Sequence, residues 1–482
     1  MPNHTDQQSD PTPANHTHSS KPDGVGRRRA LKGLGAAGIG LLGAGALGAT
    51  RGKETDPAPA PEEHPPARTY AQATRGLPPV TITNVKAIPV YVGGIELVVV
   101  KVDTDEPGLY GVGDATFRQR AHAVVAAVDA YLDDFARGRK AGHIEDMWQS
   151  AYQSSYWRNG PVLNNALSGL DQALWDIKGK RAGMPVYELL GGKSRFAVPG
   201  YSHAGGATPE AAAEDALRLV EEGFEHVRIQ LGGYGAVNRS QQADFKEAGF
   251  GREADNFMDP DPYLDGVPEM FARTREVVGD DIELLHDIHE RVEPMDALEL
   301  LKELEQYDPF FIEDPVSPEN NRWFEMIREQ THVPIAMGEL YNNPHEWVDP
   351  MVNRWFDFIR IHISQIGGIT PAMKVARLGE WFNVKTAWHG PGDVAPVGHA
   401  ANAHIDLAIW NFGIQEAPRI SDELREIFPG SPTVEDGYIH INEAPGLGVD
   451  VDEELAAKYP LPERHNYDWT QIRRKDGTIV RP

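Results

Sequence analysis

Apolar and polar residues follow two different patterns along the chain, and the change of pattern separates two folded regions. Residues 81–92 and 95–103 are rich in apolar and β-branched residues, with Gly93-Gly94 between them, which predicts two strands joined by a turn. Apolar residues then recur at helical spacing, which predicts helices at 119–137, 143–157 and 161–182. Residues 80–195 are therefore expected to form a small α+β domain.

Beyond residue 196 the pattern becomes a regular alternation of short apolar strands and amphipathic helices. Strands are predicted at 197–202, 225–230, 282–287, 309–313, 334–338, 357–361, 384–388 and 412–416. Helices are predicted at 209–222, 294–306, 319–330 and 371–382, while 398–411 is a less distinct helix rich in Ala, Asn and His. Eight strands that alternate with helices indicate an α/β fold, a (β/α)8 barrel, over residues 196–417.

Enzymes with this fold carry their chemistry at the carboxyl ends of the barrel strands. In this chain almost every predicted strand ends in a polar or ionisable side chain. The residues at these ends are His203, Arg228, Gln230, Asp287, His289, Glu313, Glu339, Arg360, His362, His389 and Glu416. A barrel that served only as a scaffold would not need them.

Three of these residues are carboxylates at consecutive strand ends. Asp287, Glu313 and Glu339 each close an apolar run, and the intervals from 287 to 313 and from 313 to 339 are both 26 residues. Three converging anions repel one another strongly unless a cation lies between them. Oxygen ligands without cysteine suit Mg²⁺ better than zinc. The alternative is that each carboxylate pairs with its own Lys or Arg.

Several other side chains are expected near the carboxylates. His289 lies two residues after Asp287, and His389 precedes a tight turn, Gly390-Pro391-Gly392, that would hold Asp393 near the same mouth. Histidine is the usual general acid or base near neutral pH. Arg228 and Gln230 point the same way, because side chains along a strand alternate. His203 and Arg360 are substrate or structural candidates, whereas His286 and His362 are expected to face the helices or neighbouring loops.

Together these groups suit removal of a proton beside a carboxylate. A metal ion would stabilise the enediolate that forms, and a second acid would decide the outcome. The acid can return a proton to carbon, which is racemisation, or expel a β-hydroxyl, which is dehydration. The residues alone leave both outcomes open.

Composition narrows the partners. The formal net charge of −26 argues against nucleic acid, because phosphate binding needs a basic surface. The acidity is what a soluble protein needs, although part of it could belong to carboxylates around a cation. The chain has no cysteine, which excludes disulfides, thiolate nucleophiles and cysteine-ligated zinc.

The first 79 residues resemble a signal peptide followed by a disordered linker. Arg27-Arg28-Arg29-Ala30-Leu31-Lys32 precedes an uncharged Gly/Ala/Leu run at 33–49, which resembles a twin-arginine signal. We expect residues 1–49 to direct export to the periplasm or the exterior through the twin-arginine machinery and then to be cleaved. A retained membrane anchor is the alternative, although the run is short for one. Residues 50–79 are a proline-rich disordered linker.

Longer motifs resemble a known group of enzymes. They are GVGDAT at 111–116, YWRNGPV at 156–162, ALWDIKGKRAGMPVYELLGG at 173–192, HDIHER from His286, FFIEDP from Phe310, GGIT at 367–370 and WHGPGDVAPVGHAANAHIDL at 388–407. With the Asp/Glu/Glu triple they resemble the enolase superfamily over residues 80–482. Within it the pattern is similar to the mannonate dehydratase branch, which includes gluconate dehydratases and starvation-sensing proteins.

The resemblance implies a capping domain at 80–195 and a segment at 418–482 that packs back on it. It implies Mg²⁺ at Asp287, Glu313 and Glu339, with His289 as the acid that expels the 3-hydroxyl of a sugar acid. Further implied contacts to the sugar acid come from His203, His389, Asp393 and Glu416. Arg228 would activate a tyrosine base in a neighbouring loop, and the enzyme would be a homo-oligomer.

The chain departs from the branch at two positions. Where the tyrosine base is expected, it has Ser240, and the nearest tyrosine is Tyr234. Members of the branch often have Asn shortly after the GDAT motif, and the corresponding position in this chain falls near Arg118. Arg118 is therefore the candidate substrate contact from the capping domain. Residues 231–270 are expected to form a long irregular loop that covers the site or meets another subunit, and this loop could present Tyr234 or Tyr263.

Three functions follow from these observations. The first is a Mg²⁺-dependent lyase that dehydrates a mannonate- or gluconate-like acid to a 2-keto-3-deoxy product. The second is a racemase, epimerase or cycloisomerase on the same scaffold. The third is a sugar-acid-binding protein with little turnover, which the absence of tyrosine at position 240 favours.

Overall fold

A computed structural model of the chain describes residues 78–232, 256–390, 392–463, 472–474, 476 and 478–481. The expected signal at 1–49 lies outside the described residues, as do Tyr234 and Ser240. Neither the export prediction nor the position of these two side chains is tested by the structure.

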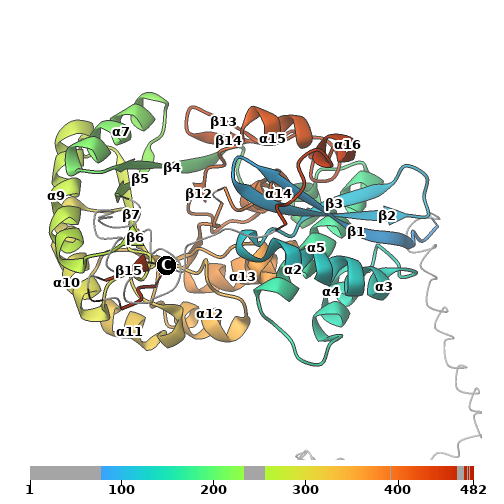
Figure 1. The fold of residues 1–482 in the computed structure, drawn as a ribbon, viewed down its shortest axis with the longest axis horizontal. Coiled ribbons are helices and arrows are strands. Elements are labelled where there is room, and N and C mark those ends of the chain that lie inside the picture. The colour runs from blue at the N-terminus through green and yellow to red at the C-terminus, as the bar shows by residue number, and fades with distance from the viewer. Residues whose placement is uncertain are drawn as a thin grey trace, which may run out of the picture. The chain divides into compact units, whose positions relative to one another are not determined.

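The N-terminal domain is built on a three-stranded antiparallel sheet with the order β1-β2-β3 (Figure 1). Its strands are β1 (Ile82–Val92), β2 (Ile95–Thr104) and β3 (Tyr110–Asp114). The turn between the first two strands uses Gly93 and Gly94 at φ angles of 59° and 82°, as the sequence predicts. The helices are α2 (Ala121–Ala127), α3 (Asp133–Ala136), α4 (Ile144–Gln153), α5 (Pro161–Ala182) and α6 (Val186–Leu190).

The helix predicted at 119–137 is interrupted. A π-helical turn at Val128–Leu132 separates α2 from α3. Helix α5 packs closely on β3, where a Cβ at Gly113 would lie 2.2 Å from the carbonyl oxygen of Gly169. The glycines of the GVGDAT motif therefore allow the sheet and the helix to approach to backbone contact.

The second domain is a closed barrel of eight parallel strands. They are β4 (Val198–Gly206), β5 (His226–Leu231), β7 (Glu283–Asp287), β8 (Phe311–Glu313), β9 (Ile335–Met337), β10 (Phe358–Ile359), β11 (Lys385–Thr386) and β12 (Gln415–Glu416). The order runs from β4 to β11, and β12 closes the barrel by pairing Glu416 with Tyr201 of β4. A parallel bridge from Thr386 to Phe412 links β11 to the segment before β12. The predicted barrel with an N-terminal α+β domain is confirmed.

Helices connect these strands around the outside of the barrel (Figure 1). They are α7 (Pro209–Glu221), α9 (Pro260–Val278), α10 (Pro294–Leu304), α11 (Arg322–Arg328), α12 (Pro344–Val352), α13 (Ile369–Phe382) and α14 (Pro396–Ala408). Sequence reasoning missed α9 and α12, each of which has an internal proline, Pro268 and Pro350. The prediction that 231–270 is irregular was wrong from Pro260 onward, because α9 begins there. The indistinct helix at 398–411 is α14, which is buried along its whole length.

The C-terminal segment contains α15 (Asp422–Ile427), β13 (Thr433–Glu435), β14 (Tyr438–His440) and α16 (Glu453–Ala456). Strand β14 pairs antiparallel with the start of β4, and the short β15 (Ile472–Arg473) pairs with β6 (Asn256–Phe257). Glu453 accepts hydrogen bonds from Lys86 and, at 2.7 Å, from Lys101 of the N-terminal sheet. No helix among the described residues has the length and apolar character needed to cross a membrane.

Candidate active site

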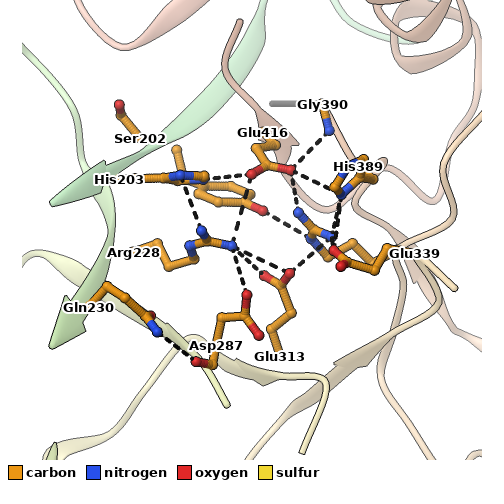
Figure 2. A network of polar contacts seen from close by, with 12 residues as sticks. Ser202, His203, Arg228, Gln230, Asp287, Glu313, Glu339, His389, Gly390 and Glu416 are labelled. Atoms are coloured by element: carbon orange, nitrogen blue, oxygen red, sulfur yellow. Dashed lines mark hydrogen bonds and ion pairs between the residues drawn. The ribbon is translucent and has the colours of Figure 1, made fainter. Parts of the chain in front are cut away.

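The carboxyl ends of the barrel strands bring most of the predicted polar side chains into one connected network (Figure 2). Below them the barrel interior is filled by apolar and aromatic side chains. These are Tyr201, Leu285, Phe311, Ala336, Phe358, Ala387 and Ile414. The polar groups thus lie against an apolar layer, where electrostatic interactions are stronger than in water.

One side of the network is a group of buried carboxylates. Asp287 ends β7 and Glu313 ends β8, and Asp314 follows directly. One oxygen of each lies within 4.8 Å of the others, and all three side chains are at most 1% exposed. Burial raises the pKa of both Asp287 and Glu313, and neighbouring carboxylates raise it further. Such a group of oxygen ligands fits a divalent cation.

Glu339, the third predicted ligand, is held differently. It follows β9, and its carboxylate lies 2.6 Å from Nη1 of Arg360 and 3.0 Å from Nδ1 of His389. Burial acts to raise the pKa of Glu339, but the charges of His389 and Arg360 outweigh it and hold the pKa well below its usual range. The same Arg360 nitrogen lies 2.9 Å from Glu313, so this arginine lies between two of the three predicted ligands.

Arg228 and Gln230 both point from β5 into the mouth, as the strand periodicity predicts (Figure 2). Nη1 of Arg228 donates to Asp287 at 3.1 Å, and Gln230 donates to the main-chain carbonyl of Asp287 at 3.0 Å. Nη2 of Arg228 lies 3.1 Å from Nδ1 of His203. Because an arginine only donates, Nδ1 of His203 accepts, and its Nε2 proton faces Glu416.

Burial and the nearby Arg228 charge lower the pKa of His203 to about 4, so its ring is neutral near pH 7. The ring has a fixed hydrogen-bonding direction at each nitrogen. His203 is therefore suited to hold Arg228 and Glu416 in place.

Arg360 organises the opposite side of the mouth. It is completely buried, and its guanidinium contacts Tyr201 Oη at 3.0 Å together with Glu313, Glu339 and Glu416. These protein groups already bind the Arg360 guanidinium, which the sequence gave as a candidate for binding substrate. We therefore interpret Arg360 as the residue that positions the surrounding carboxylates.

His389 forms a pair with Asp393, which lies 3.0 Å from its Nε2. Burial acts to lower the pKa of His389, but the charges of Asp393 and Glu339 raise it well above its usual value. Burial also acts to raise the pKa of Asp393, yet the His389 charge brings it down to about 2. The pair is thus an ion pair at neutral pH, and the two residues lie together as predicted.

His362 corrects a prediction. It was expected to face the helices or neighbouring loops, but its ring stacks on His389 with centroids 5.0 Å apart. The main-chain N–H of Ser364 donates to its Nδ1 at 3.2 Å. The Ser364 hydroxyl in turn donates to Oδ2 of Asp114 at 2.9 Å, at the end of β3. The N-terminal domain therefore reaches the His389 side through Asp114 and Ser364.

His289 and three weaker candidates complete the predicted set. His289 lies 3.6 Å from Glu339, and its main-chain N–H donates to Asp287 at 2.8 Å. Arg118 donates to the carbonyl of Gly94 at 3.1 Å, beside the β1–β2 turn. His286 faces away from the mouth, as expected, and its Nε2 lies 2.8 Å from the Tyr263 hydroxyl. Tyr263 is completely buried there, so of the two tyrosines that the loop could present to substrate this one faces away from the mouth.

Sequence reasoning missed Asp314 for a physical reason. Consecutive side chains on a strand face opposite sides, so the residue after Glu313 is expected to point away from the mouth. Asp314 instead has a φ angle of 41°, in the left-handed region, which ends the strand and turns its carboxylate toward Glu313. Two acids in succession in the FFIEDP motif were the available signal.

Comparison with known proteins agrees with this geometry. Residues 79–191 match the mandelate racemase/muconate lactonizing enzyme N-terminal domain, and residues 211–455 match the enolase C-terminal domain-like family. The chain is 50% identical over 413 residues to the D-galactonate dehydratase family member RspA of Pantoea ananatis, a match that covers 83% of this chain and 99% of the relative. A family member from Catenulispora acidiphila is 45% identical over 402 residues, covering 83% and 94%.

Solved structures give the same result. An enolase from Pantoea ananatis, crystallised with bound D-gluconate and Mg, has a TM-score of 0.78 and 49% identity, covering 84% of this chain and 100% of that one. An enolase superfamily member from Salmonella Typhimurium has a TM-score of 0.70 and 26% identity, covering 79% and 98%. The chain therefore belongs to the enolase superfamily and, within it, to the D-galactonate dehydratase family.

Proposed function

We propose that this protein is a Mg²⁺-dependent dehydratase that removes water from a sugar acid of the gluconate or galactonate type. The observation that carries the proposal is the buried carboxylate group of Asp287 and Glu313, with His289 beside it. Two findings support it: most of the chain matches the D-galactonate dehydratase family, and a structural neighbour holds D-gluconate and Mg.

The residues present fit a divalent cation. Asp287, Glu313 and Glu339 are the proposed ligands, and all offer oxygen, which Mg²⁺ prefers. The first two carry pKa values raised by burial, as expected of anions whose counter-charge is not supplied in full by the protein. A bound Mg²⁺ would supply positive charge to the substrate carboxylate as the neighbouring proton leaves.

The other side chains have separate tasks in this proposal. His289 donates a proton to the departing 3-hydroxyl, because it lies beside the ligands Asp287 and Glu339. Arg228 borders the opposite edge, where the base would act. Tyr234 remains the candidate base, although it lies outside the described residues. His389 and Asp393 are proposed to bind the hydroxyl groups of the sugar chain, with Gln230 and Arg118 as further candidates.

The substrate can be found by a direct screen. Purified protein with Mg²⁺ is incubated with six-carbon aldonic acids, including gluconate, galactonate and mannonate, and 2-keto-3-deoxy acids are assayed. We expect one or more acids to yield product, and no yield from His289→Asn. Absence of product from every acid would refute the dehydratase.

The same samples separate the two other candidates. Solvent deuterium that enters the α-carbon without loss of water would indicate a racemase or epimerase. Tight Mg²⁺-dependent binding of an acid with no deuterium exchange would indicate a binding protein, which is the outcome that Ser240 favours.

We also propose that residues 1–49 export the folded protein by the twin-arginine route. The support is the Arg27-Arg28 pair before an uncharged Gly/Ala/Leu run. Full-length protein and an Arg27→Lys/Arg28→Lys variant would be fractionated from a host with this machinery. We expect only the parent protein outside the cytoplasm, shortened near Ala49. Equal export of both would refute the route, and exported protein of full length would indicate an anchor.

A further inference from the structure

Asp314 is a buried carboxylate that was not predicted from the sequence and has no role in the proposed function. Its side chain is 1% exposed. Neither of its carboxylate oxygens has a hydrogen-bond partner among the described residues. One of them lies within 4.8 Å of the carboxylate oxygens of both Asp287 and Glu313. The side chain is thus directed into the proposed cation centre without a donor of its own.

A buried carboxylate in this state is costly. Removing a charged or polar oxygen from water without a new partner destabilises the protein by far more than an exposed charge does. Native structures therefore rarely keep such a group unless an ion or a proton neutralises it. Glu339 provides the contrast within the same site, because Arg360 and His389 lie 2.6 and 3.0 Å from its carboxylate.

The backbone fixes Asp314 where it is. Its main-chain N–H donates to the carbonyl of Ala336 at 3.0 Å, and its own carbonyl accepts from the N–H of Glu290 at 2.9 Å. These bonds tie the residue to β9 on one side and to the segment after β7 on the other. The left-handed backbone at φ 41° is tolerated by aspartate but remains less favourable than a strand conformation. The chain therefore holds this carboxylate against the cluster.

We propose that Asp314 belongs to the divalent-cation centre and supplies a further carboxylate to the ion that Asp287 and Glu313 hold. The inference rests on the proposed function in one respect, which is that these two residues bind Mg²⁺. It goes beyond the triple of strand-end ligands, because Asp314 directly follows Glu313 and does not come from a further strand one βα unit away. The centre would then have more negative charge than three ligands provide and would bind its ion more tightly.

The test is Mg²⁺ binding, which can be measured without substrate. The metal-free protein, Asp314→Asn and a control, Asp406→Asn, are titrated with Mg²⁺ by calorimetry and melted with and without the ion. Asp406 is also buried, lies on α14 and has a pKa raised well above its usual value by burial. Loss of a residue that supports a metal site typically weakens metal affinity by about 10- to 100-fold.

We expect Asp314→Asn to weaken Mg²⁺ by at least that factor and to lose most of the rise in melting temperature that Mg²⁺ gives the parent. Its melting temperature without Mg²⁺ should be unchanged or higher, because a buried anion has been removed. Asp406→Asn should bind Mg²⁺ like the parent. Equal Mg²⁺ affinity in Asp314→Asn and the parent would overturn the inference and leave the proposed function intact.

Two other outcomes are also decisive. If the parent protein takes up no Mg²⁺, the metal assignment of the proposed function fails together with this inference. If Asp314→Asn does not fold without the ion, Asp314→Ala replaces it in the same titration. Failure of both variants to fold would mean that the carboxylate stabilises the fold itself, which would also overturn the inference.

Discussion

The two sides of the barrel mouth differ in how they neutralise charge. At the ends of β7 and β8, Asp287, Glu313 and Asp314 crowd together, and burial raises the pKa of all three. Around β10 to β12, Arg360, His389 and Glu416 balance one another, and the pKa of Glu416 is held well below its usual range, against the effect of burial, by Arg360 and His203.

This difference separates a binding region from a positioning region. The first side has less positive charge than its three carboxylates need, because Arg228 and Arg360 contact only Asp287 and Glu313 there, and an added ion would supply the rest. The second side supplies its own counter-charges, so its hydrogen bonds fix side-chain directions before any ligand arrives. Arg360 joins the two, because it contacts both Glu313 and Glu416. Variants that disturb one side should therefore differ in kind from those that disturb the other.

Replacement of the joining residue should have the largest effect. Arg360→Met leaves Glu313, Glu339 and Glu416 without their shared buried cation. Breaking a buried ion pair from one side costs about 3–5 kcal/mol, so we expect a loss of at least that size in the free energy of unfolding. Urea denaturation would measure it, and dehydration should be undetectable.

The matched control is Arg377→Met, which removes an exposed arginine that pairs with Glu380 at 3.1 Å on α13. Surface pairs contribute about 0–1 kcal/mol, so its unfolding curve should stay close to that of the parent. Similar curves for the two variants would contradict the view that Arg360 joins both sides.

On the cation side, loss of charge should affect binding and leave the fold largely intact. Glu313→Gln removes one buried carboxylate, but Arg360 keeps Glu339 and Glu416 as partners, so the metal-free protein should stay folded and lose less stability than Arg360→Met. Mg²⁺ binding should weaken and activity should be lost. Calorimetry with Mg²⁺ and urea denaturation of the metal-free protein would measure both. Unchanged Mg²⁺ affinity would remove Glu313 from the ligand set.

The same contrast explains what could be predicted from the sequence. The barrel was predictable, because apolar strand runs at regular intervals specify it with little dependence on side-chain detail. Helices α9 and α12 were not, since internal prolines usually end a helix and here are tolerated. The π-helical turn at Val128–Leu132 leaves no clear trace in the spacing of apolar residues.

Within the site, strand-end residues such as Asp287, Arg228 and Gln230 were predictable from period-two alternation. Asp314 and His362 were not. Asp314 depends on one left-handed backbone angle, and His362 depends on a stack with His389 from the next strand. Both are set by tertiary structure, which the order of residues along one strand does not specify.

On the positioning side, the His389–Asp393 pair can be broken without removing a proposed metal ligand. Asp393→Asn leaves His389 with a neutral partner in place of the carboxylate 3.0 Å away. We expect kcat to fall by roughly a hundredfold, because a hydrogen bond to a charged group contributes about 1.5–3 kcal/mol and His389 would no longer be held in place by one. Steady-state kinetics on the acid found by the screen would measure it. Asp436→Asn, in the turn between β13 and β14, is the control, and equal kcat values would contradict a role for the pair.

The last expected effect, smaller than that of Arg360→Met, concerns the support of this side by the N-terminal domain. Burial raises the pKa of Asp114 to about 6, although hydrogen bonds from Thr116 and Ser364 oppose the rise. A carboxyl whose pKa is higher in the folded state favours folding below its unfolded pKa near 3.8. That contribution is lost as the pH rises through 6. The rise in the Asp114 pKa from 3.8 to about 6 corresponds to a contribution of about 3 kcal/mol to the free energy of unfolding.

Asp114→Asn keeps the shape of the side chain and removes the titration. Relative to this variant, the parent should therefore lose up to about 3 kcal/mol of unfolding free energy between pH 4 and pH 7, as measured by urea denaturation at a series of pH values. Asp171→Asn provides a second window, because burial raises the pKa of Asp171 to about 7 at the contact of α5 with Thr370. The difference in unfolding free energy between the parent and Asp171→Asn should continue to change up to a higher pH than the difference for Asp114→Asn. The difference in unfolding free energy between Asp114→Asn and the parent could instead stay constant with pH. That result would show that the Asp114 carboxyl is not buried against Ser364. The series of contacts from Asp114 through Ser364 to His362 would then be wrong as well.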